Sequence, residues 1–318
     1  MTSFDGVTSV EGPPEKGGLV RRSALILPAN VSSFVEKAHR RGADAIVLDL
    51  EDSVSADEKE AARETLPEAL KAARKGGVPV LVRVNSEFLE LVKDLDACVR
   101  PQLDEVMLPK AESADQVKIL DALLRERELL RELPVGRIKV NLVIESTLGL
   151  EHVFSISQAS KRAITLALGG EDLKRELNLD TDTDGDALLW AHSRIVLAAR
   201  AASLVPLGYP GSISNYHNIE EFQRAVEHGR RMGYAGGYCI HPRQVEVLNR
   251  GFSSSEEQVA WAQKVVDAFS ASLADGRASI SVDGQMVDTP VAERARGVLE
   301  WSRRIREFDA RKPQVEVK

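Results

Sequence analysis

Eight short runs rich in valine, isoleucine and leucine recur along the chain, and a helix-like segment follows each of them. Runs of this composition, without strict alternation, are typical of parallel strands that helices cover. Eight strand–helix units in succession predict a (β/α)₈ TIM barrel, a fold of ~250 residues. A doubly wound open sheet is the alternative. The runs are Ala24–Pro28, Ala45–Leu50, Pro79–Asn85, Glu105–Pro109, Ile138–Glu145, Ala163–Gly169, Leu204–Leu207 and Gly237–His241.

The segment after the eighth unit exceeds what a barrel needs. Ser255–Ala274 is predicted to be helical, and Ala278–Asp288 is predicted to be a hairpin with Asp283 and Gly284 in its turn. Pro290–Phe308 is predicted to be a final helix with proline at its start. We therefore expect a C-terminal helix–hairpin–helix extension.

The chain of 318 residues divides into three parts on this interpretation. Residues 1–20 are rich in glycine, proline and serine, and we expect them to be disordered. Residues 21–252 form the predicted barrel, and residues 253–318 form an arm or lid. The N-terminal segment lacks the apolar core of a signal peptide, and no apolar run reaches the ~18 residues of a membrane helix. These features predict a cytoplasmic protein.

The charge balance argues against binding to nucleic acid. Lysine and arginine number 42 and aspartate and glutamate 49, which gives a net charge of −7. The sequence has no basic cluster of the kind that binds a phosphate backbone. Two scattered cysteines, Cys98 and Cys239, are expected to be reduced and buried.

Polar side chains stand where the predicted strands end. The carboxyl ends of the strands of a closed barrel meet at one mouth, where the active sites of this fold lie. Charged groups raised there from apolar strands are costly unless they bind a partner or a ligand. The residues concerned are Asn30, Asp49, Glu51, Asp52, Arg83, Asn85, Lys110, Glu145, Glu171, Asp172 and His241.

Two of these acids suggest a metal site. Glu145 ends the fifth apolar run, and Asp172 comes soon after the sixth, behind two glycines. Carboxylate oxygens from neighbouring strands suit a hard cation such as Mg²⁺. The alternative is that both acids pair with Arg83, Lys110 or backbone donors.

Arg83 lies within the run LVRVN. Its guanidinium group would match a substrate carboxylate through two parallel hydrogen bonds. The alternative is a buried salt bridge to Glu51 or Asp52. Lys110 is expected to form an ion pair in preference to a Schiff base with substrate.

Three further features favour structural roles. His241 precedes a proline at a strand end and is expected to make a structural hydrogen bond. His192 lies on an apolar helical face and is expected in the core. Residues 180–185 copy the start of a calcium loop, but Ala191 stands where that loop requires a bidentate glutamate.

Eight segments at the strand ends form an ordered set: RRSALILPAN, IVLDLEDSV, LVRVN, VMLPKAE, VIESTLGL, LGGEDL, CIHPRQ and VDGQMVD. This set resembles the citrate lyase β-subunit-like proteins of the HpcH/HpaI aldolase superfamily, a group that includes malyl-CoA and citramalyl-CoA lyases. The resemblance extends from Arg21 to Asp288. It rests on the order of the segments, since no single motif decides it.

The resemblance implies a Mg²⁺ ion and cleavage or formation of a carbon–carbon bond next to a thioester or a 2-oxo acid. It implies that Glu145 and Asp172 hold the metal and that Glu145 and Arg83 contact the substrate. Arg22 would lie on the substrate or CoA side of the mouth. Asp288 would be the catalytic acid–base group, reaching in from a neighbouring subunit of a homo-oligomer, for which a trimer is favoured.

The resemblance thus implies a lyase that converts a 3-hydroxy-3-carboxyacyl-CoA of malyl-, citramalyl- or citryl-CoA type to an acyl-CoA and a 2-oxo acid. The CoA thioester would be a substrate and not a cofactor. Alternatives are a thioester hydrolase, a CoA-independent 2-oxo-acid aldolase and a non-catalytic metabolite-binding subunit. The chain departs from the family pattern at Ala29, at Gly237 in place of a lysine, and in the segment VPLGYPGSISNYHN. These departures leave the acyl group and the use of CoA open.

Overall fold

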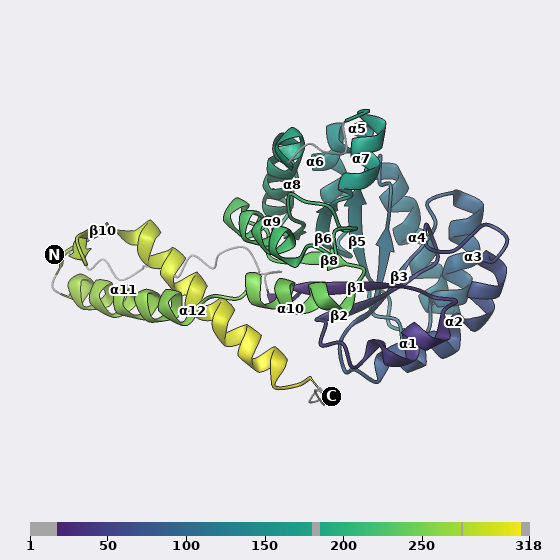
Figure 1. Cartoon of the computed structure of the whole chain (residues 1–318), viewed down its shortest axis with the longest axis horizontal. Coiled ribbons are helices and arrows are strands. Elements are labelled where there is room, and N and C mark those ends of the chain that lie inside the picture. Colours follow the sequence, from purple (N-terminus) through teal and green to yellow (C-terminus); the bar gives the residue numbers. More distant parts are fainter. Residues whose placement is uncertain (1–17, 180–184, 275, 313–318) are drawn as a thin grey trace, which may run out of the picture.

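The computed structural model describes residues 18–179, 185–274 and 276–312. The positions 180–184, which copy a calcium loop in sequence, lie outside these ranges. Figure 1 shows a large body of strands and helices on one side and a smaller arm, built from the C-terminal elements, on the other.

Eight parallel strands form where the sequence predicts them: β1 Ser23–Pro28, β2 Ala45–Asp49, β3 Val80–Arg83, β4 Glu105–Leu108, β5 Lys139–Ile144, β6 Ala163–Leu168, β7 Val205–Leu207 and β8 Gly237–Cys239. They are hydrogen bonded in the order β7-β6-β5-β4-β3-β2-β1-β8. A parallel bridge between Leu207 and Gly236 joins β7 to β8 and closes the barrel. The closure confirms the (β/α)₈ prediction and excludes the open sheet.

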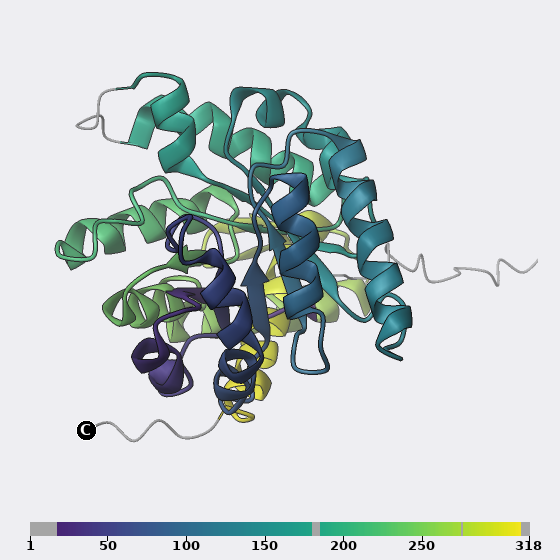
Figure 2. The ribbon, with the colours of Figure 1, turned by 90° about the vertical axis from the view of Figure 1, so that its right-hand side faces the viewer.

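Helices follow every strand and surround the barrel (Figure 2). They are α1 Ser32–Ala38, α2 Lys59–Arg74, α3 Phe88–Cys98, α4 Ala114–Leu130, α5 Thr147–Glu151, α6 Val153–Ser157, α7 Gly170–Glu176, α8 Leu189–Ala201, α9 Ile219–Met232 and α10 Pro242–Gly251, with a 3₁₀ turn, η2, at Gly185–Leu188. No helix in the described ranges is long and apolar enough to cross a membrane.

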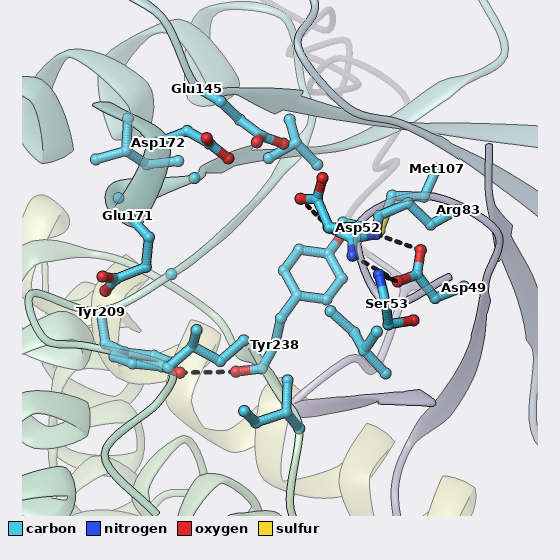
Figure 3. A pocket seen from close by; sticks show the side chains of 18 of the residues that line it. Asp49, Asp52, Ser53, Arg83, Met107, Glu145, Glu171, Asp172, Tyr209 and Tyr238 are labelled. Atoms are coloured by element: carbon cyan, nitrogen blue, oxygen red, sulfur yellow. Dashed lines mark hydrogen bonds and ion pairs between the residues drawn. The ribbon is translucent and has the colours of Figure 1, made fainter. Parts of the chain in front are cut away.

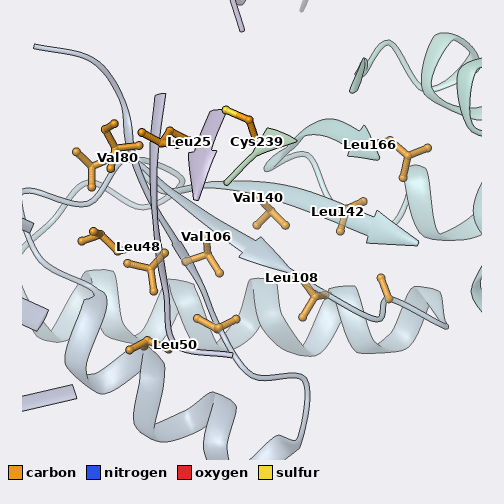
Figure 4. Close-up of a cluster of buried hydrophobic side chains, with 14 of the residues drawn as sticks. Leu25, Leu48, Leu50, Val80, Val106, Leu108, Val140, Leu142, Leu166 and Cys239 are labelled. Carbon is orange, nitrogen blue, oxygen red and sulfur yellow. The ribbon is translucent and has the colours of Figure 1, made fainter. Parts of the chain in front are cut away.

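The strands send alternate side chains to two separate cores. On β1, Leu25 and Leu27 pack under the helices, whereas Ala24 and Ile26 face the barrel interior. Figure 4 shows the outer core, where apolar side chains from the strands meet the helices. Both cysteines are buried as free thiols, as predicted. Because each strand is packed on both faces, its carboxyl end is held in a fixed position at the mouth.

The C-terminal arm is the predicted helix–hairpin–helix: α11 Glu256–Ala274, β9 Ile280–Val282, β10 Gln285–Val287 and α12 Thr289–Asp309. The turn residues Asp283 and Gly284 have φ values of 51° and 77°, as a tight hairpin of this kind requires. In Figure 1, α11 and the hairpin project away from the barrel and α12 runs back toward it. The arm has its own apolar core, formed by Ala262, Val265, Phe269, Val282, Val287, Ala292 and Ala295.

Candidate active site

The mouth of the barrel contains a cavity of about 530 Å³. Acidic and basic side chains from β2, β3, β5 and the start of α7 line one part of it, and Figure 3 shows these side chains around a common space. The strand-end acids and Arg83 therefore meet at the mouth, as the sequence predicts. Asp49, Asp52, Arg83, Glu145, Glu171 and Asp172 belong to this lining.

Arg83 is clamped by Asp49, the last residue of β2. Its Nε and Nη2 atoms donate to Asp49 Oδ1 and Oδ2 at 2.7 and 2.6 Å. Burial alone would raise the pKa of Asp49, but the hydrogen bonds and charge of Arg83 hold it below its usual value. Nη1 of Arg83 lies 3.0 Å from Glu51 Oε2. The edge formed by Nη1 and Nη2 is thus the one that remains for a substrate carboxylate, in competition with Glu51.

Lys110 forms the expected ion pair and does not stand free for covalent chemistry. Its ammonium group lies 2.5 Å from Glu51 Oε1 and 3.4 Å from Asp52 Oδ1. These charges raise the pKa of Lys110 in spite of its partial burial. Burial in turn raises the pKa of Glu51, although Arg83 and Lys110 oppose this effect. The cations at this side of the mouth are therefore already engaged.

Glu145 and Asp172 form a carboxyl–carboxyl pair. Glu145 is buried, whereas Asp172 is partly exposed, and the two side chains lie near each other at the mouth (Figure 3). Burial, this contact and the charge of Glu51 raise the pKa of Glu145 to about 8, with Arg83 acting in the opposite sense. A second carboxyl group beside a buried carboxylate disfavours the charged form of the buried group. Asp172 also accepts an ion pair from the exposed Arg175 at 2.7 Å.

The glycine before α7 makes room for this pair. A Cβ atom at Gly169 would come within 2.4 Å of Glu145 Cγ and 2.7 Å of its Cδ. Any other residue at this position would push Glu145 out of place. The sequence GGED thus has two structural effects. It brings Asp172 to the mouth, and it leaves space for the Glu145 side chain.

The Glu145–Asp172 pair fits a hard divalent cation. A cation beside the two groups would stabilise the charged form of Glu145, whose pKa is raised by burial first and by the neighbouring Asp172 second. The described residues contain no group of three or more His, Cys, Asp or Glu side chains placed to hold a metal. The protein would therefore give two oxygen ligands only, and substrate and water oxygens would complete the set, as Mg²⁺ prefers.

The expectation that Arg22 lies at the mouth is wrong for the chain's own barrel. Arg22 precedes β1 and so lies at the amino end of the strands. Its guanidinium group donates to both oxygens of Asp44 at 2.9 Å, and to Asp309 of α12 at 2.6 Å. The side chain is buried among these partners. Arg22 therefore ties the end of α12 to the base of the barrel.

Asp288 lies on the arm, between β10 and α12, and not in the cavity of its own chain. Its Oδ1 accepts the backbone N–H of Val291 at 3.2 Å and caps α12. The structure does not bring Asp288 together with Glu145 or Arg83. A role for Asp288 in the reaction thus requires a second copy of the chain.

The remaining strand-end residues have structural partners. His241 caps α10 through its Nδ1 atom, which accepts from Arg243 N at 3.1 Å. Asn85 Nδ2 donates to Leu50 O at 3.0 Å. His192 is buried, as predicted, and its Nδ1 atom lies 2.8 Å from the Tyr234 hydroxyl group. Burial lowers the pKa of His192 to about 4.

Sequence reasoning missed the aromatic side of the cavity. Tyr209, Tyr238 and Phe34 line the same space as the acids. One signal could have found Tyr238, because alternate residues of β8 face the barrel interior and Tyr238 is paired with the inward-facing Ala24 of β1. Phe34 lies in the first helix after β1, where the sequence gives no such register.

A closed barrel that gathers acids and a clamped arginine at the carboxyl ends of its strands belongs with the barrel enzymes that act on anionic substrates. The sequence profile of one such family, HpcH/HpaI aldolase/citrate lyase, matches residues 22–242. The chain belongs to this family, whose named relatives are lyases, and is itself a lyase of the family.

Two groups of characterised relatives resemble the chain over most of its length. Citrate lyase subunit beta of Leuconostoc mesenteroides subsp. cremoris is 35% identical over 281 residues, which cover 88% of this chain and 92% of the relative. L-malyl-CoA/beta-methylmalyl-CoA lyase of Cereibacter sphaeroides is 30% identical over 301 residues, which cover 87% and 93%.

A solved structure with the same fold is the CitE protein of Mycobacterium tuberculosis in complex with magnesium, acetoacetate and coenzyme A. It superimposes with a TM-score of 0.72 and 27% identity, and the match covers 90% of this chain and 99% of that one. A citrate lyase beta subunit from the same organism, complexed with oxaloacetate and magnesium, matches with a TM-score of 0.60 and 26% identity over 74% of this chain and 99% of that one.

Proposed function

We propose that the protein is a Mg²⁺-dependent lyase that cleaves, or in reverse forms, a 3-hydroxy-3-carboxyacyl-CoA of malyl-, citramalyl- or citryl-CoA type. The single observation that carries the proposal is the pairing of the buried Glu145 with the partly exposed Asp172 at the mouth, two carboxyl groups that a divalent cation would neutralise. The magnesium, CoA and oxo-acid ligands of the CitE structures support the same assignment.

The reaction divides between bond breaking and proton transfer. The 3-hydroxyl group loses its proton, the bond between carbons 2 and 3 breaks, and a 2-oxo acid leaves with a new carbonyl group. The electron pair of the broken bond passes to carbon 2 and the thioester carbonyl, which gives an enolate. This enolate takes up one proton to become the acyl-CoA, so that protons and electrons balance. A bound Mg²⁺ would supply Lewis acidity toward the oxygens of the oxo-acid half.

The chain's own residues hold the substrate and keep the mouth preorganised. Glu145 and Asp172 would give the metal its protein ligands. Arg83 would bind the substrate carboxylate through its Nη1–Nη2 edge, with Asp49 fixing the orientation of the guanidinium plane. A charged group held in advance costs no reorganisation when charge develops in the transition state.

Asp288 would complete the site from a neighbouring subunit. The arm carries Asp288 away from its own barrel, next to Met286, which is 70% exposed. In a closed homo-oligomer, for which we favour a trimer, each arm would place Asp288 over the next mouth, where it would carry the proton that the hydroxyl group loses and the enolate gains. The partners of the protein would then be small molecules and further copies of the chain.

The function is tested with a panel of thioesters and free acids in the presence of Mg²⁺. For malyl-CoA or citramalyl-CoA, the proposal predicts equal amounts of 2-oxo acid and acyl-CoA and no free thiol. Free thiol without a 2-oxo acid would instead show a thioester hydrolase, and turnover of free acids alone would show an aldolase that does not use CoA. Binding of every compound without turnover would overturn the enzymatic proposal.

Subunit exchange tests the position of Asp288. Asp288→Ala should lose at least about 100-fold in turnover, since acid–base groups contribute 10²–10⁴-fold. Arg83→Ala should lose a comparable factor, because it removes the whole charge-assisted contact with the substrate carboxylate. Mixed and allowed to exchange subunits, the two variants should regain part of the activity, because some mouths then receive both intact residues. Absence of any recovery, despite exchange demonstrated by mass spectrometry, would place Asp288 outside a shared site.

A further inference from the structure

The cavity at the mouth has two chemically different halves. One half carries the acids and Arg83, and the other is lined by Tyr209 and Tyr238 in its depth and by Phe34, Ile213 and Ile240 at its rim. We propose that this apolar half receives an alkyl substituent on the acyl part of the substrate, so that acyl groups longer than acetyl are preferred. The inference rests on the proposed lyase function and specifies its substrate class.

Tyr209 forms a fixed wall of the apolar half. A Cβ atom at Gly237 would come within 2.7 Å of the Tyr209 ring, so the ring requires glycine at that position of β8. The Tyr209 hydroxyl group donates to the backbone oxygen of Tyr238 at 2.8 Å (Figure 3). Its ring packs edge-on against Phe222 with centroids 5.1 Å apart. The ring is therefore packed against Gly237, the backbone oxygen of Tyr238 and the Phe222 ring, which hold it at one side of the cavity.

The depth of the apolar half carries no formal charge at neutral pH. Burial raises the pKa of Tyr238 to about 12 and raises that of Tyr209 as well, so both phenols stay protonated. The barrel interior below is filled by packed side chains such as Ala24 and Val143. A chain that enters here reaches a closed end, which suits a short alkyl group better than the long, amide-bearing pantetheine arm of CoA.

The rim leaves apolar surface open to solvent. Phe34 is 54% exposed and Ile240 is 40% exposed, although both line the cavity. Apolar side chains gathered at the entrance of a pocket are typical of a ligand site. Because the charged groups lie in the other half, the oxo-acid end of the substrate and its alkyl end would be directed to opposite sides.

The first experiment measures binding of acetyl-, propionyl- and butyryl-CoA to the full-length protein by calorimetry with Mg²⁺ present. Each added methylene group should tighten binding by about fourfold, the factor expected for one fully buried methylene. Equal dissociation constants across the series would overturn the inference. Condensation of each thioester with glyoxylate is measured in parallel, and kcat/KM should rise in the same order.

Matched variants at the rim tie the effect to the apolar half of the cavity. Phe34→Ser combined with Ile240→Ser should keep the affinity for acetyl-CoA within about twofold and reduce the gain per methylene to less than twofold. Phe88→Ser is the control, because Phe88 is 55% exposed but does not line the cavity, and its gain should equal that of the wild type. A gain that persists in the double variant would assign the alkyl group elsewhere.

The two readouts separate this inference from the proposed function. If binding depends on acyl chain length but no thioester is turned over, the apolar pocket is supported and the proposed lyase function is contradicted. If all three thioesters are turned over with equal kcat/KM and bind with equal affinity, the lyase function is supported and the apolar pocket for the alkyl group is contradicted.

Discussion

Both ends of the barrel bury arginine and acidic side chains, but these charges are paired at the amino end and only partly paired at the mouth. At the amino end, Arg21 is fully buried and donates to both oxygens of Glu105 at 3.0 and 2.6 Å, while Asn141 donates to the same carboxylate at 2.7 Å. Arg22 is matched in the same way by Asp44. Each buried charge named here has an opposite charge in a two-bond contact.

At the mouth, acids outnumber the cations that could neutralise them. Arg83 forms an ion pair with Asp49, and Lys110 forms one with Glu51. Glu145 then faces another carboxyl group, and its pKa rises to about 8. Buried charge that is fully paired serves the fold, whereas buried charge left without a counter-ion marks a place for a ligand.

The sharpest test of this contrast is removal of the mouth carboxylates. Glu145→Gln or Asp172→Asn should lower turnover by about 10³-fold or more, because loss of a Lewis-acid site costs several kcal/mol in the transition state. The midpoint of urea unfolding should not fall. Glu171→Gln is the matched control on the same helix, since Glu171 is half-exposed and lies 3.8 Å from Lys174, and it should lose less than tenfold.

The opposite outcome is expected at the amino end. Arg21→Met should lower the free energy of unfolding by about 3–5 kcal/mol, because it leaves the buried Glu105 carboxylate without its counter-ion. A double variant that also replaces Glu105 with Leu should recover part of this loss. Urea unfolding at pH 7 measures both. A loss below 1 kcal/mol, or a weaker affinity for Mg²⁺ in the folded protein, would contradict the structural role.

Arg83 tests whether a clamped cation at the mouth still serves the substrate. Arg83→Lys keeps the charge but loses the planar fork, so kcat/KM should fall by an order of magnitude or more, since a charge-assisted hydrogen bond contributes ~1.5–3 kcal/mol. Steady-state kinetics with the free energy of unfolding as a second readout separate the roles. Normal kinetics with lowered stability would assign Arg83 to the fold alone.

His192 lines the cavity, but it is buried and its Nδ1 atom contacts the Tyr234 hydroxyl group, so we expect it to affect stability, as the charged groups at the amino end do. Its pKa is lowered by burial, from an ordinary 6.5 to about 4. Between pH 6.5 and about pH 4, His192 is therefore protonated in the unfolded chain but not in the folded chain. The free energy of unfolding falls as the pH falls through this range. We expect a loss of about 2 kcal/mol between pH 7 and pH 5 from this group. His192→Gln should remove that part of the slope in urea unfolding, and an unchanged slope would contradict it.

Much of the fold follows from local sequence patterns. The eight runs fixed the strands because a buried parallel strand needs little beyond its own apolar residues. Asp283 and Gly284 predicted their hairpin because few other residues accept the φ values that the turn requires. The acids of the mouth could be predicted to meet because the ends of neighbouring parallel strands must lie side by side.

Pairings across the barrel could not be predicted in the same way. The sequence named Glu51 or Asp52 as a salt-bridge partner of Arg83, and both lie within reach of its Nη1 atom, at 3.0 and 3.7 Å. It did not name Asp49, because only the register of β2 and β3 brings Asp49 and Arg83 opposite each other. Arg22 was assigned to the mouth by resemblance, and its contact with Asp309, 287 positions away, depends on how the arm returns. Long-range side-chain partners follow from packing, which the pattern of one sequence does not contain.

Titration calorimetry with Mg²⁺ in the presence of oxaloacetate tests whether Glu145 and Asp172 hold the metal. We expect the wild-type protein to bind one Mg²⁺ per chain, Glu145→Gln and Asp172→Asn each to abolish this binding, and Glu171→Gln to retain it. Unchanged Mg²⁺ affinity in both Glu145→Gln and Asp172→Asn would contradict the assignment of the mouth pair as the metal site.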